Sequence, residues 1–124
     1  MESLDQFQII KEVISRATAA AQSGWSEMII DYHVEGGQSE FANSYLITIN
    51  NAIYEKPLPL HNDLDIWMRR LRTELTRVGE VPFTSCKLHV HADGIFEASY
   101  GYDPVDWDAL VTYGWNFPEV SKLH

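Results

Sequence analysis

Two histidines and a glutamate in "KLHVHADGIFEASYGYD", residues 87–103, are the side chains whose spacing best suits chemistry. His89 and His91 are two positions apart, so on a β-strand both project to one side, about 6.5–7 Å apart. Glu97 is the nearest carboxylate. A zinc site needs at least a third ligand from elsewhere in the chain, and His33 and His61 are the other candidates. The sequence contains no H-E-x-x-H or paired-cysteine pattern.

The same stretch predicts a β-hairpin, because apolar and polar residues alternate on both sides of "ADG". A three-residue loop with Gly94 in the left-handed conformation pairs His89 with Glu97 and Val90 with Phe96. A two-residue loop would set Val90 opposite Glu97, which contradicts the pattern. We therefore prefer a ladder facing solvent, in which Glu97 supports His89 across the strands. On this interpretation we expect neither a metal nor another cofactor.

Other routes to catalysis have little support in the sequence. Cys86 falls on the apolar side of the predicted hairpin, so we expect it to be buried rather than nucleophilic. No G-x-S-x-G, phosphate-binding loop or G-x-G-x-x-G is present. We do not expect an enzyme. The alternative is a small metal- or carboxylate-dependent hydrolase that uses His89, His91 and Glu97.

A second candidate surface lies in residues 103–119, where acidic and aromatic side chains are interleaved. Its members are Asp103, Asp106, Trp107, Asp108, Tyr113, Trp115 and Glu119. Such a mixture suits the energetic centre of an interface with a basic protein. The alternative is that the rings fill the core while the acids solvate the same segment.

The net charge of −9 is unevenly distributed, with −6 over residues 1–55, +2 over 56–90 and −5 over 91–124. A field of this sign repels nucleic acid and anionic lipid and attracts basic partners. We therefore expect no direct nucleic-acid or membrane binding. The basic run "MRRLRTELTR" is interpreted as the solvated face of a helix rather than an RNA contact. Acidity that only aids solubility is the simpler alternative.

The chain alternates between helical and strand patterns. Residues 3–24 predict a helix of about 18 residues, with Ser3 and Gln6 as its capping box and Gly24 at its end. Its expected apolar stripe is Phe7, Ile10, Ile14, Ala17 and Ala21. Strands are predicted over 25–35 and 39–55. A second helix follows over 62–79, and its expected stripe is Leu64, Met68, Leu71, Leu75 and Val78.

After the hairpin, Asp103 and Pro104 predict the start of a short third helix that runs to about Val111. The order α-β-β-α-β-β-α favours an α+β fold. We expect one domain over residues 1–124, in which helices cover one face of an antiparallel sheet of about four strands. A single cysteine excludes an intrachain disulfide and fits a reducing compartment. The N-terminus lacks signal-peptide features and no apolar run approaches 20 residues, so we expect a cytoplasmic protein.

The ordered motifs resemble the YezG-like family of bacterial antitoxins and immunity proteins. The resemblance lies in a helix leading into Gly-Trp and a strand, "SGWSEMIIDYHVEG", and in the hairpin "PFTSCKLHVHADGIFEASYGYDPVDW". It covers about residues 4–110. Members of this family neutralise a cognate toxin, often a secreted nuclease domain of contact-dependent inhibition or related polymorphic toxin systems. The family has no catalytic motif to carry over, and "VTYGWNFPEVSKLH" matches none of its patterns.

The resemblance and the charge together predict an immunity protein that blocks a basic toxin domain stoichiometrically, with a nuclease as the expected toxin. The first expected interface is the set of residues 103–119 given above, and the second is His89, His91 and Glu97. A generic adaptor or chaperone for a secreted effector is the third hypothesis.

Overall fold

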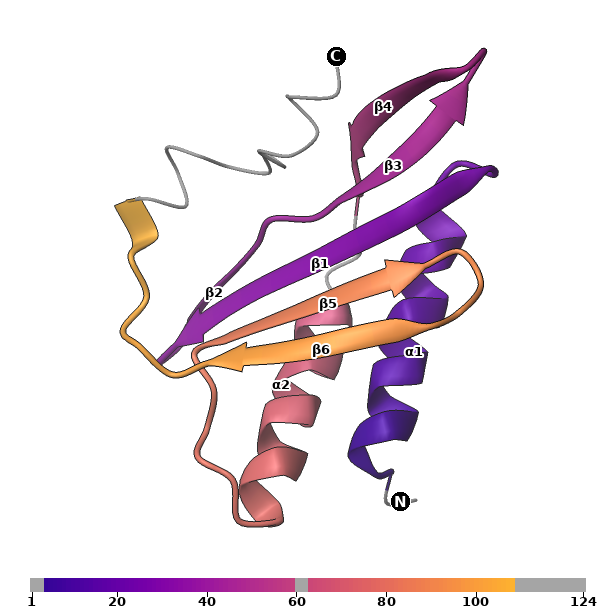
Figure 1. The fold of residues 1–124 in the computed structure, drawn as a ribbon. Helices are drawn as coiled ribbons and strands as arrows, with labels where there is room; N and C mark the ends of the chain where they lie inside the picture. Colours follow the sequence, from indigo (N-terminus) through magenta and orange to yellow (C-terminus); the bar gives the residue numbers. More distant parts are fainter. Residues whose placement is uncertain (1–3, 60–62, 109–124) are drawn as a thin grey trace.

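The computed structural model describes residues 4–59 and 63–108 (Figure 1). In chain order the elements are α1 (Gln6–Ala20), β1 (Trp25–Glu35), β2 (Gln38–Phe41), β3 (Ser44–Ile49), β4 (Ala52–Pro57), α2 (Asp63–Arg77), β5 (Ser85–His91) and β6 (Phe96–Gly101). Both helices lie on the same side of the sheet. The α+β class is therefore confirmed, whereas the expected sheet of about four strands is wrong.

Helix α1 begins two residues later than its predicted capping box. Asp5 is the N-cap, and its carboxylate accepts from Gln8 N while the Gln8 side chain accepts from Asp5 N, both at 2.9 Å. The buried stripe is Ile9, Ile10, Val13 and Ala17. Phe7, expected in this stripe, is 59% exposed. The helix ends at Ala20, and Gly24, with φ +98°, belongs to the turn into β1 rather than to the helix cap.

Strand β1 has the bounds predicted for it, residues 25–35, and from Met28 to Val34 every second side chain is buried. Met28, Ile30, Tyr32 and Val34 are fully buried beneath the helices, which confirms this assignment. The segment expected to form one strand over residues 39–55 instead forms β2, β3 and β4. Asn50 and Asn51 make the turn between β3 and β4, with φ of 52° and 66°. Two successive left-handed residues are the signature of a type I′ hairpin, and asparagine tolerates that conformation better than most residues.

Helix α2 buries Leu64, Met68, Leu71 and Leu75 as expected, but Val78 is 53% exposed because the helix has already ended at Arg77. Gly79 adopts φ +99°, and Glu80 N donates to Leu75 O at 3.0 Å while Gly79 N donates to Thr76 O at 3.1 Å. These two bonds satisfy the last helical carbonyls. Within the described ranges, neither helix combines the length and the apolar character that a membrane span requires.

The sheet has the order β4-β3-β1-β5-β6, with β2 paired to the end of β1, and every pairing is antiparallel. The predicted β5–β6 register is confirmed: His89 pairs with Glu97, Val90 with Phe96, and Gly94 has φ +92°. Strand β1 is at the centre and pairs with β3 on one side and β5 on the other. The core therefore lies between the two helices and the inward side chains of β1, β3 and β5.

A polar contact ties α2 to the underside of the sheet. The buried Tyr32 hydroxyl donates to Asp65 Oδ1, which also accepts from Ser39 Oγ at 2.7 Å and from Arg69 Nε at 3.2 Å. Burial raises the pKa of Tyr32, and so does the hydrogen bond to Asp65. Burial alone would also raise the pKa of Asp65, but these three donors outweigh it and hold that pKa below its ordinary value. Asp65 therefore stays ionised while it anchors the helix.

Candidate functional site

The face of the sheet opposite the helices, called the open face below, carries most of the chemically capable side chains. Because successive residues of a strand point to opposite sides, the paired registers fix its members. They are Glu27, Ile29, Asp31, His33 and Glu35 of β1, Gln38 and Glu40 of β2, Ser44, Leu46 and Thr48 of β3, Ile53 and Glu55 of β4, Ser85, Lys87, His89 and His91 of β5, and Glu97 and Ser99 of β6.

Charge is segregated between the open face and the helices. The open face holds six carboxylates, and among the described residues Lys87 is its single lysine or arginine. The carboxylates are Glu27, Asp31, Glu35, Glu40, Glu55 and Glu97. The two helices carry six basic and four acidic side chains, a net charge of +2: Lys11, Arg16, Arg69, Arg70, Arg72 and Arg77 against Glu12, Asp63, Asp65 and Glu74. The negative field of the protein is therefore concentrated on the side of the sheet that the helices leave uncovered.

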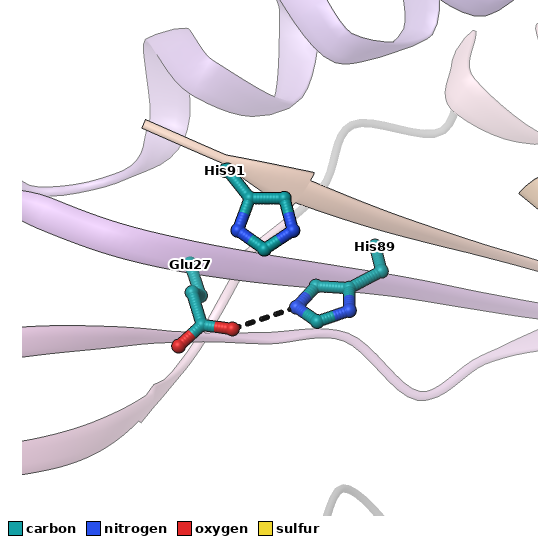
Figure 2. Close-up of side chains that lie close together, drawn as sticks. All are labelled: Glu27, His89 and His91. Atoms are coloured by element: carbon teal, nitrogen blue, oxygen red, sulfur yellow. Dashed lines mark hydrogen bonds and ion pairs between the residues drawn. The ribbon is translucent and has the colours of Figure 1, made fainter. Parts of the chain in front are cut away.

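Glu27, His89 and His91 converge at one end of the open face (Figure 2). His91 is the direct neighbour of Glu27 across the β1–β5 ladder, and His89 is two positions further along. His89 Nε2 lies 2.8 Å from Glu27 Oε1, and the two imidazole rings are 4.6 Å apart between centroids with a tilt of 32°. One ligand atom from each of the three side chains lies within 4.8 Å of the others.

The expected partnership of His89 with Glu97 is wrong in its side-chain contacts, although the two residues are paired in the backbone register. The carboxylate bound to His89 comes from β1, and Glu97 Oε1 instead approaches His91 Nε2 at 3.5 Å. The physical reason is that β5 is flanked by strands on both sides, and the closer acidic side chain belongs to the strand that is distant in sequence. His33 lies elsewhere on the open face, opposite Ser85, and His61 lies outside the described residues.

Next to this cluster along β1 and β5 is a shallow hollow of about 280 Å³, lined by Asp31, His33, Lys87 and Ser99 among others. Gly101 forms part of its wall, and a Cβ at that position would collide with Ser85 Oγ. His33 Nε2 is buried and lies 2.9 Å from Asp31 Oδ1, although the approach lacks hydrogen-bond geometry. The hollow is therefore shallow and open to solvent, and its lining is polar and apolar in similar measure.

The acidic and aromatic segment is described only in part. Thr84 Oγ1 donates to Asp103 O, and Val105 N donates to Glu35 Oε1 at 3.2 Å, so the segment is held at the end of β1 and β5 far from His91. That end lies about 20 Å from His91 along β5, given seven residues at strand rise. The described part of the first predicted interface, residues 103–108, is therefore attached at the end of the sheet away from His91.

The helix expected from Pro104 does not form over residues 104–106, and helical conformation begins at Trp107 and Asp108. Asp103, Asp106 and Asp108 are exposed and Trp107 is half-buried. Tyr113, Trp115 and Glu119, together with the rest of the expected helix, lie outside the described residues.

Cys86 is fully buried beneath the helices, as expected from the strand pattern. Burial, aided by the negative charge of Asp31, raises the pKa of its thiol to about 12. Because the thiolate is the nucleophilic form, this cysteine is unreactive near neutral pH.

Over residues 4–59 and 63–108, the fold and the site define a class: an α+β protein in which two helices cover one face of a six-stranded antiparallel sheet, and the opposite face is acidic and bears histidines. Comparison of the chain with protein-family models and with curated proteins finds no match.

Proposed function

We propose that this protein is an immunity protein, which binds a basic toxin domain in a stoichiometric complex and blocks it without catalysis. The expected toxin is a nuclease, because the cleft of a nuclease is built to attract a polyanion. The protein would act where it is made, in the cytoplasm.

One observation carries this proposal: the segregation of charge between the open face and the helices. Among the described residues, six carboxylates and one lysine share the open face, a net charge of −5, whereas α1 and α2 together have six basic and four acidic side chains, a net charge of +2. A surface of this kind orients an approaching basic protein and speeds its association, up to about 10⁸–10⁹ M⁻¹s⁻¹ at low salt. It also explains why the protein would dock by its sheet rather than by its helices.

The open face has a second property that suits a protein partner. Strands are rigid supports, and here they present fixed carboxylates on several neighbouring ladders, with Asp103 and Asp108 continuing the same charge beyond β6. Truncating or reversing charges on such a surface mainly alters the association rate and its salt dependence. The order of motifs, which resembles that of YezG-like immunity proteins, supports the same function.

The test is binding to a candidate toxin, namely a small basic domain that ends a large secreted protein encoded beside this chain. Co-expression of this chain should abolish the toxicity of the domain, and calorimetry should show one-to-one binding. Glu40→Lys and Glu97→Lys should each slow association roughly tenfold at low salt, because they reverse charge on the open face.

Glu80→Lys is the matched control, because Glu80 is an exposed acid just after α2, on the side of the helices. It should leave the association rate nearly unchanged. Equal slowing by all three substitutions would mean that only net charge matters and that the open face is not the interface. Absence of any complex would contradict the proposed function itself.

A further inference from the structure

We propose that Glu27, His89 and His91 form a binding site for a divalent zinc ion, which bridges β1 and β5 on the open face. Within the described parts of the chain, this is the group in which three histidine, cysteine or carboxylate side chains approach closely enough to share one ion. The proposal does not depend on the function proposed above.

The site is assembled by sheet register. His89 and His91 project to the same side of β5, and the antiparallel β1–β5 ladder sets Glu27 directly opposite His91. All three side chains point toward one another from two hydrogen-bonded strands (Figure 2). Since β1 and β5 are central strands whose inward side chains are buried, the backbone positions of the three ligands are held rigidly.

The distances are close to those of a metal centre. Ligand atoms bound to zinc at 2.0–2.2 Å in a tetrahedron are about 3.3–3.6 Å apart. In this protein the three ligand atoms lie within 4.8 Å of one another, and the closest pair, His89 Nε2 and Glu27 Oε1, is 2.8 Å apart. Small side-chain rotations therefore suffice to place an ion between the three groups. Zinc binds the unprotonated ring nitrogen of histidine and the ionised carboxylate, so any proton on the ligand atoms would leave as the ion binds.

The chemistry of the ligands selects the metal. Two imidazoles and one carboxylate suit zinc, whereas magnesium and calcium prefer a shell made of oxygen atoms. The side chains of Glu27, His89 and His91 are 40%, 35% and 36% exposed, so an ion can enter and a fourth position remains open to water. Three protein ligands and one water is the arrangement of an open zinc site.

Glu97 acts as a positioning residue for this site. Its Oε1 lies 3.5 Å from His91 Nε2, on the β6 side of the cluster. A carboxylate beside a ligating histidine orients its ring and increases its basicity. The surrounding carboxylates of the open face also raise the local concentration of cations.

The test uses the full chain after removal of any affinity tag and treatment with EDTA. Titration with zinc against a competing chelator should give one ion per chain with a dissociation constant of about 10 μM or tighter. Magnesium and calcium should not compete. Glu27→Gln, His89→Gln and His91→Gln should each weaken zinc binding at least tenfold, and Glu97→Gln should weaken it by about tenfold or less.

His33→Gln is the matched control, because His33 lies on the same face of β1 beside a carboxylate but outside the cluster. It should bind zinc like the unaltered protein. Equal loss in His33→Gln and His89→Gln, or a dissociation constant weaker than about 100 μM, would overturn the proposal.

A measurement without substitutions guards against variants that fail to fold. In the NMR spectrum of the unaltered protein, zinc should shift the ring resonances of His89 and His91 at a stoichiometry of one, and leave those of His33 in place. Shifts spread evenly over all the histidines would mean adventitious binding and would also overturn the proposal.

Discussion

The two faces of the sheet come from the same strands but obey different rules. On the side covered by the helices, every second residue of β1 and β5 is apolar and buried, including Met28, Ile30, Leu88 and Val90. On the open face the intervening residues are charged, histidine or serine, with a few exceptions such as Ile29. Along each strand, the side chains that face the helices therefore stabilise the fold, and the intervening side chains on the open face are available for binding. Stability should be sensitive to the first face and recognition to the second.

The largest expected effect on stability is a difference between two adjacent positions of β5, one on each face of the sheet. Leu88 is fully buried, so Leu88→Ala should lower the free energy of unfolding by about 3 kcal/mol, through lost burial and a cavity. Lys87 points to the open face, and Lys87→Ala should change the free energy of unfolding by less than about 0.5 kcal/mol. Urea unfolding measures both. Similar losses in the two variants would mean that the faces are not divided as described.

A smaller effect is expected where α2 is anchored to the sheet. Asp65→Asn should lower the free energy of unfolding by about 1–2 kcal/mol at neutral pH, because the carboxylate accepts from Tyr32, Ser39 and Arg69. The pKa of Asp65 is lower in the folded than in the unfolded protein. The stabilisation is therefore complete above about pH 4 and is lost as the pH falls through the folded pKa.

Urea unfolding of the two proteins at a series of pH values tests this sign. The difference in stability should shrink below about pH 4. Glu80→Gln, at an exposed carboxylate, serves as the control and should show no comparable change. A difference that stays constant from neutral to strongly acid pH would exclude Asp65 as the responsible group.

The β3–β4 turn tests the edge of the sheet, where neither face is deeply buried. Asn51 has φ 66°, so Asn51→Ala should lower the free energy of unfolding by about 1 kcal/mol, and Asn51→Gly should preserve or raise it. Thermal unfolding of the pair is the measurement. Equal stability of the alanine and glycine variants would argue against the left-handed turn.

The smallest effect on stability, and a clear effect on binding, is expected beyond β6. Reversing Asp106 and Asp108 to lysine should change the free energy of unfolding by less than about 1 kcal/mol, because both are exposed. The same change should slow association with the toxin and flatten its salt dependence. Stopped-flow mixing at several salt concentrations checks this. Unchanged kinetics at every ionic strength would remove this segment from the interface and leave the open face as the candidate.

Local patterns predicted much of the fold. The alternation around "ADG" was sufficient for the complete β5–β6 register, because a glycine at the left-handed position allows only one pairing that keeps Val90 and Phe96 on the same side. The α2 stripe was equally well marked. The errors arose where two patterns overlap. The prediction of one strand over residues 39–55 rests on the alternation of Tyr45, Ile47 and Ile49 with other residues, and the turn that follows, at residues 50–51, lacks the glycine that signals most tight hairpins. The signal that the sequence offered was the pair of consecutive asparagines, a residue type that tolerates the left-handed conformation.

The candidate site was half predicted. His89 and His91 were identified from their spacing, and their common side follows from strand geometry. Glu27 was missed, because no local pattern connects it to residues that are 62 positions away in the chain. Glu97 was the acid that the predicted hairpin pairs with His89, but it is not the one whose side chain contacts His89. The expected set at residues 103–119 could be compared with the structure only at Asp103, Asp106, Trp107 and Asp108.

By itself, the sequence determined which residues form most helices and strands, which side of each strand is apolar, and that the protein carries a strong negative charge. These properties depend on neighbours a few positions apart, where backbone periodicity acts directly. Only the tertiary structure decided that β5 lies beside β1, and thereby that Glu27 meets two histidines and that six carboxylates share one face. The physical reason is that the order of the strands depends on burying the whole core beneath two helices. This burial involves all the elements together and cannot be read from any one segment.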